Sequence, residues 1–524
     1  MGRVRAPRRK ARDGLPLGTL LVLGISSGLL NILASPPLGW YRLAFVHLIP
    51  YAFALACERR GTRLLACAAC FQMVRFLGLG AYFFEPLFGL LYVGLGCLLV
   101  PMLQGLARLI PAAQRRPAVR LLLFAPLFVA TEFLQAILSP LPAFLATSGA
   151  LLGGSPYLGL ARAGGLFGLS AFVVAVNALL AWVWLPRHWS PRGREPWRPR
   201  RLLLAAALAL AVLTAGVAGS QRLLALNHDA YLRRPERSRF AAVSVSRAFA
   251  AETQRYWDDE AHDEVARLAQ TEVTLIADAL ADHRTRLDLI VLPEDMVDFE
   301  FWGAADPEAQ TRFGIRNAGP LLQLYRAVAQ EQASELLCVL TTLETTGRYN
   351  SAVLLDREGH LMGVSHKTVL ALAMESWPFG AWRPFYFDWV LNAAERRASP
   401  VYNMAYRYRA GTAAALFTTD RGLAFASPIC IELHHPWRMA TLVRRGAQAL
   451  VHTSSNMGIE RGLAQYTGQT MNLRRILSAW LGVPIVFCGR LDDAGIVLPD
   501  GRVEGVATGE APFAVFWGEV RHGG

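Results

Sequence analysis

The chain has 524 residues, of which 53% are hydrophobic and 18% are charged, and its mean hydropathy is positive. A soluble globular protein is less apolar and more charged, so the composition indicates a membrane protein. The net charge of +13 does not indicate a nucleic-acid-binding surface, because it comes from residues 1–220, where 22 basic and five acidic side chains give +17 between hydrophobic runs. The remainder has 31 basic and 35 acidic residues, and therefore a charge of −4.

Seven hydrophobic runs in the first 220 residues predict membrane-spanning helices, since about 17 to 25 apolar residues cross a bilayer. They lie roughly at residues 17–34, 43–57, 64–83, 87–106, 119–138, 158–185 and 201–219. The second run is shorter than the others. A cleaved signal peptide would also begin with such a run, but the six further runs favour an uncleaved anchor.

The connections between these runs alternate in charge. Arginines cluster after the second, fourth and sixth runs, within residues 59–63, 108–120 and 187–201, whereas connections 81–86 and 139–157 contain neither lysine nor arginine. By the positive-inside rule the basic N-terminus is cytoplasmic. An odd number of crossings then places the second half of the chain on the outer face of the membrane.

Three charged residues, Arg75, Glu132 and Arg162, fall inside the hydrophobic runs, where charge is costly and is expected to face a partner or a cavity. An ion pair that holds helices together is a simpler role for them than direct contact with a lipid headgroup. Cys67 and Cys70 form a CxxC sequence in the same region, but without a second pair they indicate packing rather than redox or metal chemistry.

From about residue 238 the pattern changes to short apolar runs that alternate with helical periodicity, which predicts an α/β domain. Helices are predicted at 260–281, 319–335 and 464–481. The polar, glycine-containing sequence LDREGHL joins two apolar runs and predicts a hairpin. The predicted strands are FAAVSV, LDLIVLP, LLCVLTTL, NSAVLLD, LMGVSH, GLAFASPICI, ALVHTS, VPIVFCG and GIVLP.

Three reactive side chains stand at or near the ends of predicted strands: Glu294 in LIVLPEDM, Lys367 in GVSHKTV and Cys430 in ASPICIEL. Strand ends are where α/β sheets expose functional groups. Each residue also has a simpler interpretation, as a solvated turn carboxylate, a surface lysine and a core cysteine. Lys367 is nevertheless unusual, since it and Lys10 are the two lysines among 53 basic residues.

Acyl transfer through a thiol needs these three residue types. A cysteine becomes nucleophilic when a base takes its proton, and a carboxylate can accept that proton and return it to a leaving group. A fixed cation near the nucleophile stabilises the oxyanion of the tetrahedral intermediate. Arginine would replace lysine poorly there, because a planar guanidinium and a compact ammonium place their charge differently.

The order and surroundings of these residues resemble the nitrilase superfamily, whose members carry a Glu, Lys, Cys triad on an α-β-β-α sandwich. With the preceding hydrophobic runs, the chain resembles the bacterial apolipoprotein N-acyltransferase family. The resemblance rests on LASPPLGWYRLAFV and LGLARAGGLFGLSAFVVAVNALLA in the first half, and on LPED, RYNSAVLLDREGHLMGVSHK and PICIEL in the second.

The resemblance implies a membrane domain of about seven transmembrane helices at 1–220 and an extracytoplasmic nitrilase-like catalytic domain at 238–520. It implies that Glu294 is the general base, Lys367 the oxyanion stabiliser and Cys430 the nucleophile. Glu375 falls where the family has a second essential glutamate, and Glu432 matches a family acid in a Cys-x-Glu sequence. A loop carboxylate and a structural hydrogen-bond acceptor are the simpler interpretations of these two residues.

The activity implied by the resemblance is transfer of a fatty acyl chain from a phospholipid, through a cysteine thioester, to the N-terminal amine of a diacylglyceryl-cysteine lipoprotein. It implies a multi-pass protein of the bacterial cytoplasmic membrane with its catalytic domain on the periplasmic face. No cofactor, metal or nucleic acid is expected. A membrane-tethered amidase that releases the acyl group to water, and a non-catalytic scaffold, are the alternatives.

Several segments depart from the family pattern. The sequence LALAMESWPFG stands where the family has Leu-Val-Pro-Phe-Gly-Glu, SNMGIE replaces Asn-Asp-Ala-Trp-Phe-Gly near Asn456, and the chain ends at FWGEVRHGG without a further membrane span. The acceptor, the acyl-chain preference, the oligomeric state and the pairing of Cys338 with Cys488 are left open.

An aromatic segment follows Glu375. Amphipathic aromatic side chains favour a membrane interface, although folding onto their own domain is an equal alternative. The residues are Trp377, Phe379, Trp382, Phe385, Tyr386, Phe387 and Trp389, and 298–307 is expected to join them in a lid.

Overall fold

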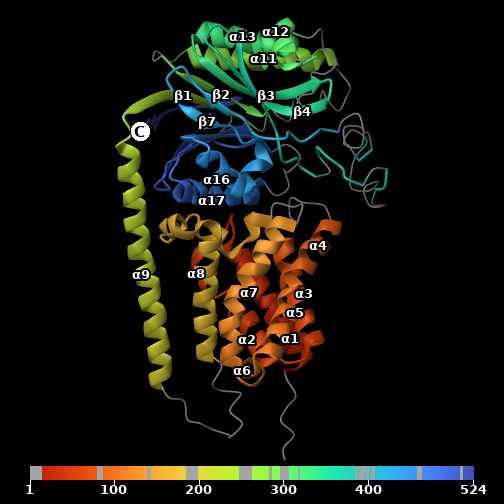
Figure 1. Cartoon of the computed structure of the whole chain (residues 1–524), viewed down its shortest axis with the longest axis vertical. Coiled ribbons are helices and arrows are strands. Elements are labelled where there is room, and N and C mark those ends of the chain that lie inside the picture. The colour runs from red at the N-terminus through yellow and green to blue at the C-terminus, as the bar shows by residue number, and fades with distance from the viewer. Residues whose placement is uncertain are drawn as a thin grey trace, which may run out of the picture. The chain divides into compact units, whose positions relative to one another are not determined.

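The structure is a computed structural model, which divides the chain into two compact units, Met1–Gln221 and Arg222–Gly524 (Figure 1). It describes residues 15–79, 86–138, 143–184, 199–246, 262–281, 286–294, 306–316, 319–372, 374–379, 381–383, 388, 396, 401–402, 407–456, 463–507 and 511–523.

The first unit is helical. Its helices are α1 (Leu17–Ala34), η1 (Tyr41–Phe45), α2 (Ile49–Cys57), α3 (Gly61–Leu79), α4 (Pro86–Cys97), α5 (Leu99–Leu109), α6 (Pro111–Arg115), α7 (Pro117–Leu138), η2 (Ala143–Ala146), η3 (Ser148–Leu152), η4 (Leu158–Leu160) and α8 (Ala161–Trp184). Helix α9 (Pro199–Leu232) runs from this unit into the second.

Within the described residues, five helical segments are long and apolar enough to cross a membrane: Leu17–Ala34, Leu90–Leu109, Pro117–Leu138, Leu158–Trp182 and Ala206–Leu232. They fit a transmembrane protein. The two runs without such a segment are 43–57 and 64–83. Run 43–57 is a shorter apolar stretch that is divided into η1 and α2 before Pro50, and run 64–83 corresponds to α3. Run 87–106 is divided into α4 and α5 before Pro101 but corresponds to the segment Leu90–Leu109. The number of crossings therefore stays a prediction.

Small residues let the first two long helices of this unit approach closely. A Cβ atom on Gly24 of α1 would lie 2.5 Å from the Cys67 carbonyl oxygen of α3, and one on Gly28 would lie 2.6 Å from the Val74 side chain. Close backbone approach through small residues is the usual way in which membrane helices pack, since lipid offers no hydrophobic drive between them. Cys67 is buried and both it and Cys70 are free thiols, which agrees with a packing role.

The predicted intramembrane ion pair is confirmed. Nη2 of Arg75 on α3 lies 2.5 Å from Oε1 of Glu132 on α7, and it also donates to the carbonyl of Ala146. The same carboxylate oxygen accepts from the backbone N–H and the hydroxyl of Ser148, each at 2.8 Å. Arg162 lies on the exposed surface of this unit instead.

The second unit is built around a mixed sheet. Its strands are β1 (Glu236–Val245), β2 (Leu289–Glu294), β3 (Glu335–Glu344), β4 (Gly347–Leu355), β5 (Leu361–His366), β6 (Leu416–Thr418), β7 (Ala424–Ala426), β8 (Ala449–Ser455), β9 (Ile485–Arg490), β10 (Ala494–Val497), β11 (Val503–Val506) and β12 (Phe513–His522). Its helices after α9 are α11 (His262–Ala281), α12 (Pro307–Phe313), α13 (Gly319–Gln332), η8 (Cys430–His434), α16 (Pro436–Arg444) and α17 (Leu463–Leu481).

The sheet is nearly closed and folds into a nitrilase-like sandwich. Its strand order is β5-β4-β3-β2-β1-β9-β8-β7-β6, with β1, β2 and β3 parallel and β7, β8 and β9 parallel. Strands β2 and β8 do not pair, yet they are in contact, so the two halves of the sheet face one another. Helices α11, α12 and α13 cover one side of the sheet and α16 and α17 the other (Figure 1), which gives the predicted α-β-β-α layers.

Alternation along the strands produces two cores. On β1, Ala241 and Val243 face the core under α11 and α13, while Phe240 and Ala242 face the core between the two halves of the sheet. This period of two is what a strand with both faces buried requires. Cys338 lies in the core under α11 and α13, whereas Cys488 lies in the core between the two halves of the sheet. The two cysteines are therefore not paired, and both are free thiols.

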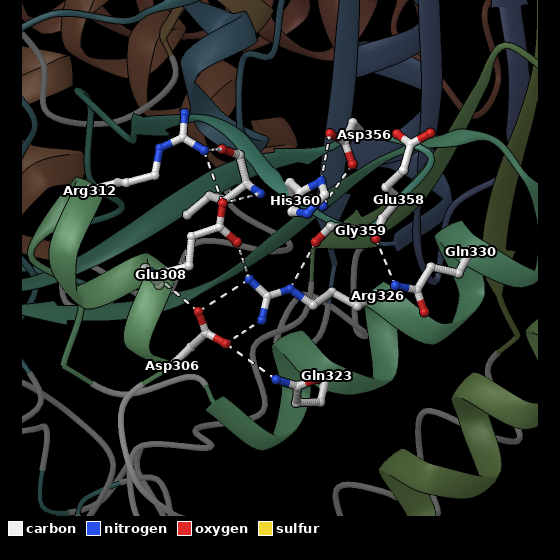
Figure 2. Close-up of polar contacts among 12 residues, drawn as sticks. Asp306, Glu308, Arg312, Gln323, Arg326, Gln330, Asp356, Glu358, Gly359 and His360 are labelled. Atoms are coloured by element: carbon white, nitrogen blue, oxygen red, sulfur yellow. Dashed lines mark hydrogen bonds and ion pairs between the residues drawn. The ribbon is translucent and has the colours of Figure 1, made fainter.

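Polar contacts attach α12 and α13 to the hairpin between β4 and β5 (Figure 2). Arg326 of α13 donates to Asp306 at the start of α12, to Glu308 at 2.6 Å and to the Gly359 carbonyl at 2.8 Å. Asp306 also caps α12 by accepting the N–H of Ala309 at 2.9 Å. This network fixes the hairpin that ends at Lys367.

The chain departs from the predicted strand GLAFASPICI. The strand β7 ends at Ala426, and Cys430 begins the short helix η8 with φ of +50°. Strands β6 and β12 and helices α12 and α16 were absent from the sequence prediction. Of these, β12 is the longest strand and pairs with β1 along ten residues.

Candidate active site

Glu294 is the last residue of β2 and its side chain is 1% exposed, which excludes the solvated turn interpretation. Pro293 precedes it and cannot donate to the sheet, and the register with β3 shifts at this point. The carboxylate is held from two sides. Oε2 accepts the backbone N–H of Ser455 at 2.8 Å, and Oε1 accepts the side-chain amide of Asn350 at 2.7 Å.

Lys367 directly follows β5 and is 1% exposed. Its backbone N–H donates to the carbonyl of Asn350 on β4 at 2.8 Å, which continues the hairpin pairing and directs the side chain inward. Nζ then lies 3.2 Å from Oε1 of Glu294 and 2.9 Å from Oε1 of Glu375. The unusual lysine is therefore a buried cation between two carboxylates and not a surface residue.

Glu375 is 2% exposed and closes this cluster. Oε1 accepts from Lys367 and from Asn350, the latter at 2.8 Å, and Oε2 accepts the backbone N–H of Ala371 at 2.7 Å. Glu375 is thus bound to the same two donors as Glu294, and the loop carboxylate interpretation does not hold.

The cluster of Glu294, Lys367 and Glu375 has two carboxylates and one ammonium group. Burial raises the pKa of Glu294, and the negative charge of Glu375 raises it further, while Lys367 opposes both effects. Burial alone would lower the pKa of Lys367, but the charges of Glu294 and Glu375 hold it well above its ordinary value. The ammonium is therefore a permanent charge, and the carboxylates hold the proton-accepting capacity.

Cys430 borders this cluster closely enough for Glu294, Lys367 and Glu375 all to affect its pKa. Burial raises that pKa to about 12, as does the charge of Glu294, whereas Lys367 and a hydrogen bond from the Ile431 N–H lower it. The resting group is therefore a thiol, and it would become a thiolate only by giving its proton to a base.

Glu432 lies two residues after the cysteine and is 4% exposed. Oε1 accepts the backbone N–H of Thr368 at 2.7 Å and its hydroxyl at 2.6 Å, and Oε2 accepts the N–H of Ile429 at 2.9 Å. Burial raises its pKa. The carboxylate ties the residue after Lys367 to the residue before Cys430, so it links the position of the ammonium to that of the thiol.

Asn350 is a site residue to which the sequence assigned no role. In the sequence it is one polar residue of the predicted strand segment RYNSAVLLD. The alternation of apolar and polar residues along β4 does not distinguish a buried site residue from an exposed one at this position. In the structure its amide donates to both Glu294 and Glu375. It is a second, uncharged donor beside Lys367.

The predicted aromatic lid is described in part. Trp377 is buried and its Nε1 donates to the carbonyl of Trp382 at 2.7 Å, while Phe379 and Trp382 are exposed and pack on it edge to face and in parallel. Two of these aromatics are therefore at the surface. Phe385, Tyr386, Phe387, Trp389 and 298–305 lie outside the described residues, as does most of SNMGIE.

One exposed turn within the described residues carries three groups with metal-ligand chemistry. Asp356, Glu358 and His360 stand between β4 and β5, with their ligand atoms within 4.8 Å of one another (Figure 2). His360 Nδ1 lies 3.2 Å from Asp356 Oδ2, an exposed interaction that needs no ion. The turn contains no residue of the Glu294, Lys367 and Glu375 cluster.

Comparisons with known proteins match both halves of the chain. Residues 27–179 match the apolipoprotein N-acyltransferase N-terminal domain, and residues 259–508 match the carbon-nitrogen hydrolase domain. No curated protein matches the chain.

Solved structures resemble about half of the chain. A carbon-nitrogen hydrolase from Helicobacter pylori G27 is 15% identical over 54% of this chain and 89% of its own, with a TM-score of 0.36. Nit3 of Saccharomyces cerevisiae, a member of branch 10 of the nitrilase superfamily, is 16% identical over 54% and 90%, with a TM-score of 0.34. An amidase from Nesterenkonia sp. is 15% identical over 53% and 89%, with a TM-score of 0.32.

The two domain matches carry the assignment, and they support an apolipoprotein N-acyltransferase-like function in a superfamily whose members are generally enzymes. The apolar helices agree with a membrane protein. The chain therefore belongs to the family that joins an apolipoprotein N-acyltransferase N-terminal domain to a carbon-nitrogen hydrolase domain.

Proposed function

We propose that the protein transfers a fatty acyl chain from a phospholipid to the α-amine of a diacylglyceryl-cysteine lipoprotein, with Cys430 as the nucleophile. The observation that carries this proposal is the buried cluster of two carboxylates and one ammonium beside a thiol. The cluster has one more carboxylate than ammonium groups. It can therefore accept the proton that the Cys430 thiol has to lose when it attacks.

In the first step, the Cys430 sulfur attacks the ester carbonyl of the phospholipid while its proton passes to Glu294. A tetrahedral intermediate forms, and its oxyanion is stabilised by the Lys367 ammonium and the nearby Ile431 N–H. The ester C–O bond then breaks. Glu294 returns the proton to the leaving oxygen, which releases a lysophospholipid and leaves an acyl thioester on Cys430.

In the second step, the α-amine of the acceptor attacks the thioester and loses a proton to Glu294. The C–S bond breaks, the proton moves to the Cys430 sulfur, and the products are an amide and the free thiol. Lys367 serves both steps because its charge is held in place by Glu294 and Glu375. Glu375 and Asn350 act by positioning Lys367 and Glu294.

The apolar helices and the match to the apolipoprotein N-acyltransferase N-terminal domain favour lipid substrates over a water-soluble amide. A location in the bacterial inner membrane, with the catalytic unit on the periplasmic side, follows from this proposal and from the arginine clusters of the predicted cytoplasmic loops.

The test is incubation of the purified protein in detergent with a phospholipid, followed by addition of a synthetic diacylglyceryl-cysteine peptide. We expect an acyl adduct on Cys430 that persists in water and moves to the peptide amine. Rapid loss of the adduct to water would favour the amidase alternative. Absence of any adduct in folded protein would overturn the proposal.

A further inference from the structure

His452, inside the apolar strand β8, contacts the nucleophile from behind. Its side chain is 1% exposed, and Nε2 lies 3.0 Å from the carbonyl oxygen of Cys430. On the other side of the ring, Nδ1 lies 3.0 Å from Nη2 and 3.3 Å from Nε of Arg474 on α17. A histidine buried in a strand is usually a satisfied core residue, but this one is hydrogen-bonded to the residue that would react.

The partners of His452 determine its tautomer. A guanidinium has donors and no acceptor, so Nδ1 of His452 has to accept from Arg474. The ring proton is therefore on Nε2, which donates to the Cys430 carbonyl. Burial, and the positive charge of Arg474, hold the pKa of His452 well below its usual range, so the ring stays neutral.

Arg474 is itself fixed. It is fully buried, and Nη2 lies 2.6 Å from Oδ2 of Asp492, which also accepts from the hydroxyl of Ser454 at 3.2 Å. Its guanidinium lies 4.4 Å over the ring of Phe487. A chain of hydrogen bonds, in which the contacts of Arg474 are charge-assisted, thus runs from Asp492 through Arg474 and His452 to the backbone of Cys430.

The carbonyl that His452 binds belongs to the peptide unit between Cys430 and Ile431. Because a peptide unit is planar and trans, fixing its carbonyl fixes the direction of its N–H. That N–H, from Ile431, is near enough to the Cys430 sulfur to lower the pKa of its thiol. The unit follows a residue at φ of +50°, a conformation that a cysteine keeps only where its surroundings impose it.

We propose that His452, oriented by Arg474 and Asp492, is a positioning residue that holds the Cys430–Ile431 peptide plane so that the Ile431 N–H points at the reacting sulfur and the oxyanion. The part that concerns the oxyanion rests on the proposed acyl transfer. The part that concerns the thiol does not, because it applies to any reagent that Cys430 attacks.

The experiment compares four variants by the rate at which iodoacetamide alkylates Cys430, followed by mass spectrometry of the peptide that contains it, and by kcat and KM for acyl transfer. His452→Leu removes the donor. His452→Gln keeps one donor and one acceptor. Arg474→Met removes the contact that orients the ring. His522→Leu is the matched control, since His522 is also fully buried but its Nε2 hydrogen-bonds Ser238 on β1.

Loss of one buried hydrogen bond predicts about a 10-fold fall in alkylation rate and in kcat for His452→Leu, with KM unchanged. We expect about a 3-fold fall for Arg474→Met, recovery of most of the rate in His452→Gln, and the wild-type rate per folded molecule in His522→Leu. Equal losses in His452→Leu and His452→Gln, or wild-type rates in His452→Leu, would overturn the proposal.

Nitrogen-15 NMR of wild-type protein labelled at histidine gives a result that no variant's folding affects. The signal of His452 should show a protonated Nε2 and an unprotonated Nδ1, and the opposite tautomer would contradict the proposal. If alkylation follows the expected order but no acyl adduct forms, the positioning role stands and the acyl-transfer proposal fails.

Discussion

Each unit of the protein buries a charge cluster, and the two clusters differ by one carboxylate. In the helical unit, Arg75 pairs with Glu132, and both side chains are 1% exposed. In the second unit, Lys367 is equally buried but contacts both Glu294 and Glu375. The first cluster is electrically balanced, whereas the second has a surplus negative charge beside a thiol.

We attribute to this difference the structural role of the first cluster and the proposed reactivity of the second. A balanced pair has no reason to exchange protons, and its effect is to join α3 to α7. In a cluster with one carboxylate too many, the charge of Glu375 raises the pKa of Glu294, which can then take a proton from a neighbour. On the proposed mechanism, similar residue types at similar depth therefore differ in function because the number of carboxylates differs.

Replacing Lys367 should have the largest effect. In Lys367→Arg the charge remains. A planar guanidinium does not fit between the Glu294 and Glu375 oxygens, however, because in the wild type both contact the single Nζ atom of Lys367. We expect thioester formation to slow about 1,000-fold, as for loss of an oxyanion donor. The measurement is the single-turnover rate of Cys430 acylation, with Arg75→Lys as the matched change in the other cluster. A rate within tenfold of the wild type would contradict this account.

Unbalancing the helical cluster should instead change stability. Glu132→Leu leaves Arg75 buried without its partner, which costs about 3–5 kcal/mol. The double variant Arg75→Met/Glu132→Leu should recover most of the loss, because it restores electrical balance. Unfolding in detergent measures both, while the alkylation rate of Cys430 per folded molecule stays unchanged. Equal destabilisation of the single and double variants would argue against a simple ion pair.

These two clusters also show what the sequence reveals. Glu294, Lys367 and Cys430 were found because each follows a recognisable apolar run, and the chemistry of acyl transfer needs all three. Arg75 and Glu132 were found because charge inside a hydrophobic run demands a partner. A local sequence pattern is therefore sufficient to predict a site residue or an ion pair where the residue type conflicts with its apolar surroundings.

Other features depend on contacts that are distant in sequence. Strand β12 pairs with β1, which lies more than 260 residues earlier, so nothing local requires it to be a strand. His452 lies in an apolar run like any core residue, and its role depends on Arg474 and on the carbonyl of Cys430. The left-handed conformation of Cys430 was missed because the residues around it in GLAFASPICI, from Leu423 to Ile431, are mostly apolar and include no glycine.

Removing the surplus carboxylate should change the pH dependence of the site. The charge of Glu375 raises the pKa values of Glu294 and Cys430, so Glu375→Gln lowers both. In the proposed mechanism Glu294 acts as a base only when it is deprotonated, so the acid limb of Cys430 alkylation should move to lower pH. Alkylation rates measured across the acid range test this. A limb that stays in place would show that Glu375 does not act through its charge.

The smallest expected effect concerns a carboxyl outside the candidate site. Burial raises the pKa of Glu335 from 4.5 to about 7. Between these values the folded state holds a proton that the unfolded state has lost, so the free energy of unfolding falls as pH rises from about 4.5 to about 7. We expect Glu335→Gln to remove this pH dependence. The free energy of unfolding of the variant should equal that of the wild type near pH 4.5 and exceed it above about pH 7. Urea unfolding at several pH values measures it, and an unchanged slope would contradict it.

The central claim is that the unbalanced cluster takes the proton of Cys430 and makes its sulfur the attacking atom. Intact-protein mass spectrometry after incubation with a phospholipid tests it most directly, on the wild type, Cys430→Ala and Glu294→Gln. The account predicts one acyl group on Cys430 in the wild type, none in Cys430→Ala and slow accumulation in Glu294→Gln. An acyl group on another residue, or unchanged acylation in Glu294→Gln, would contradict it.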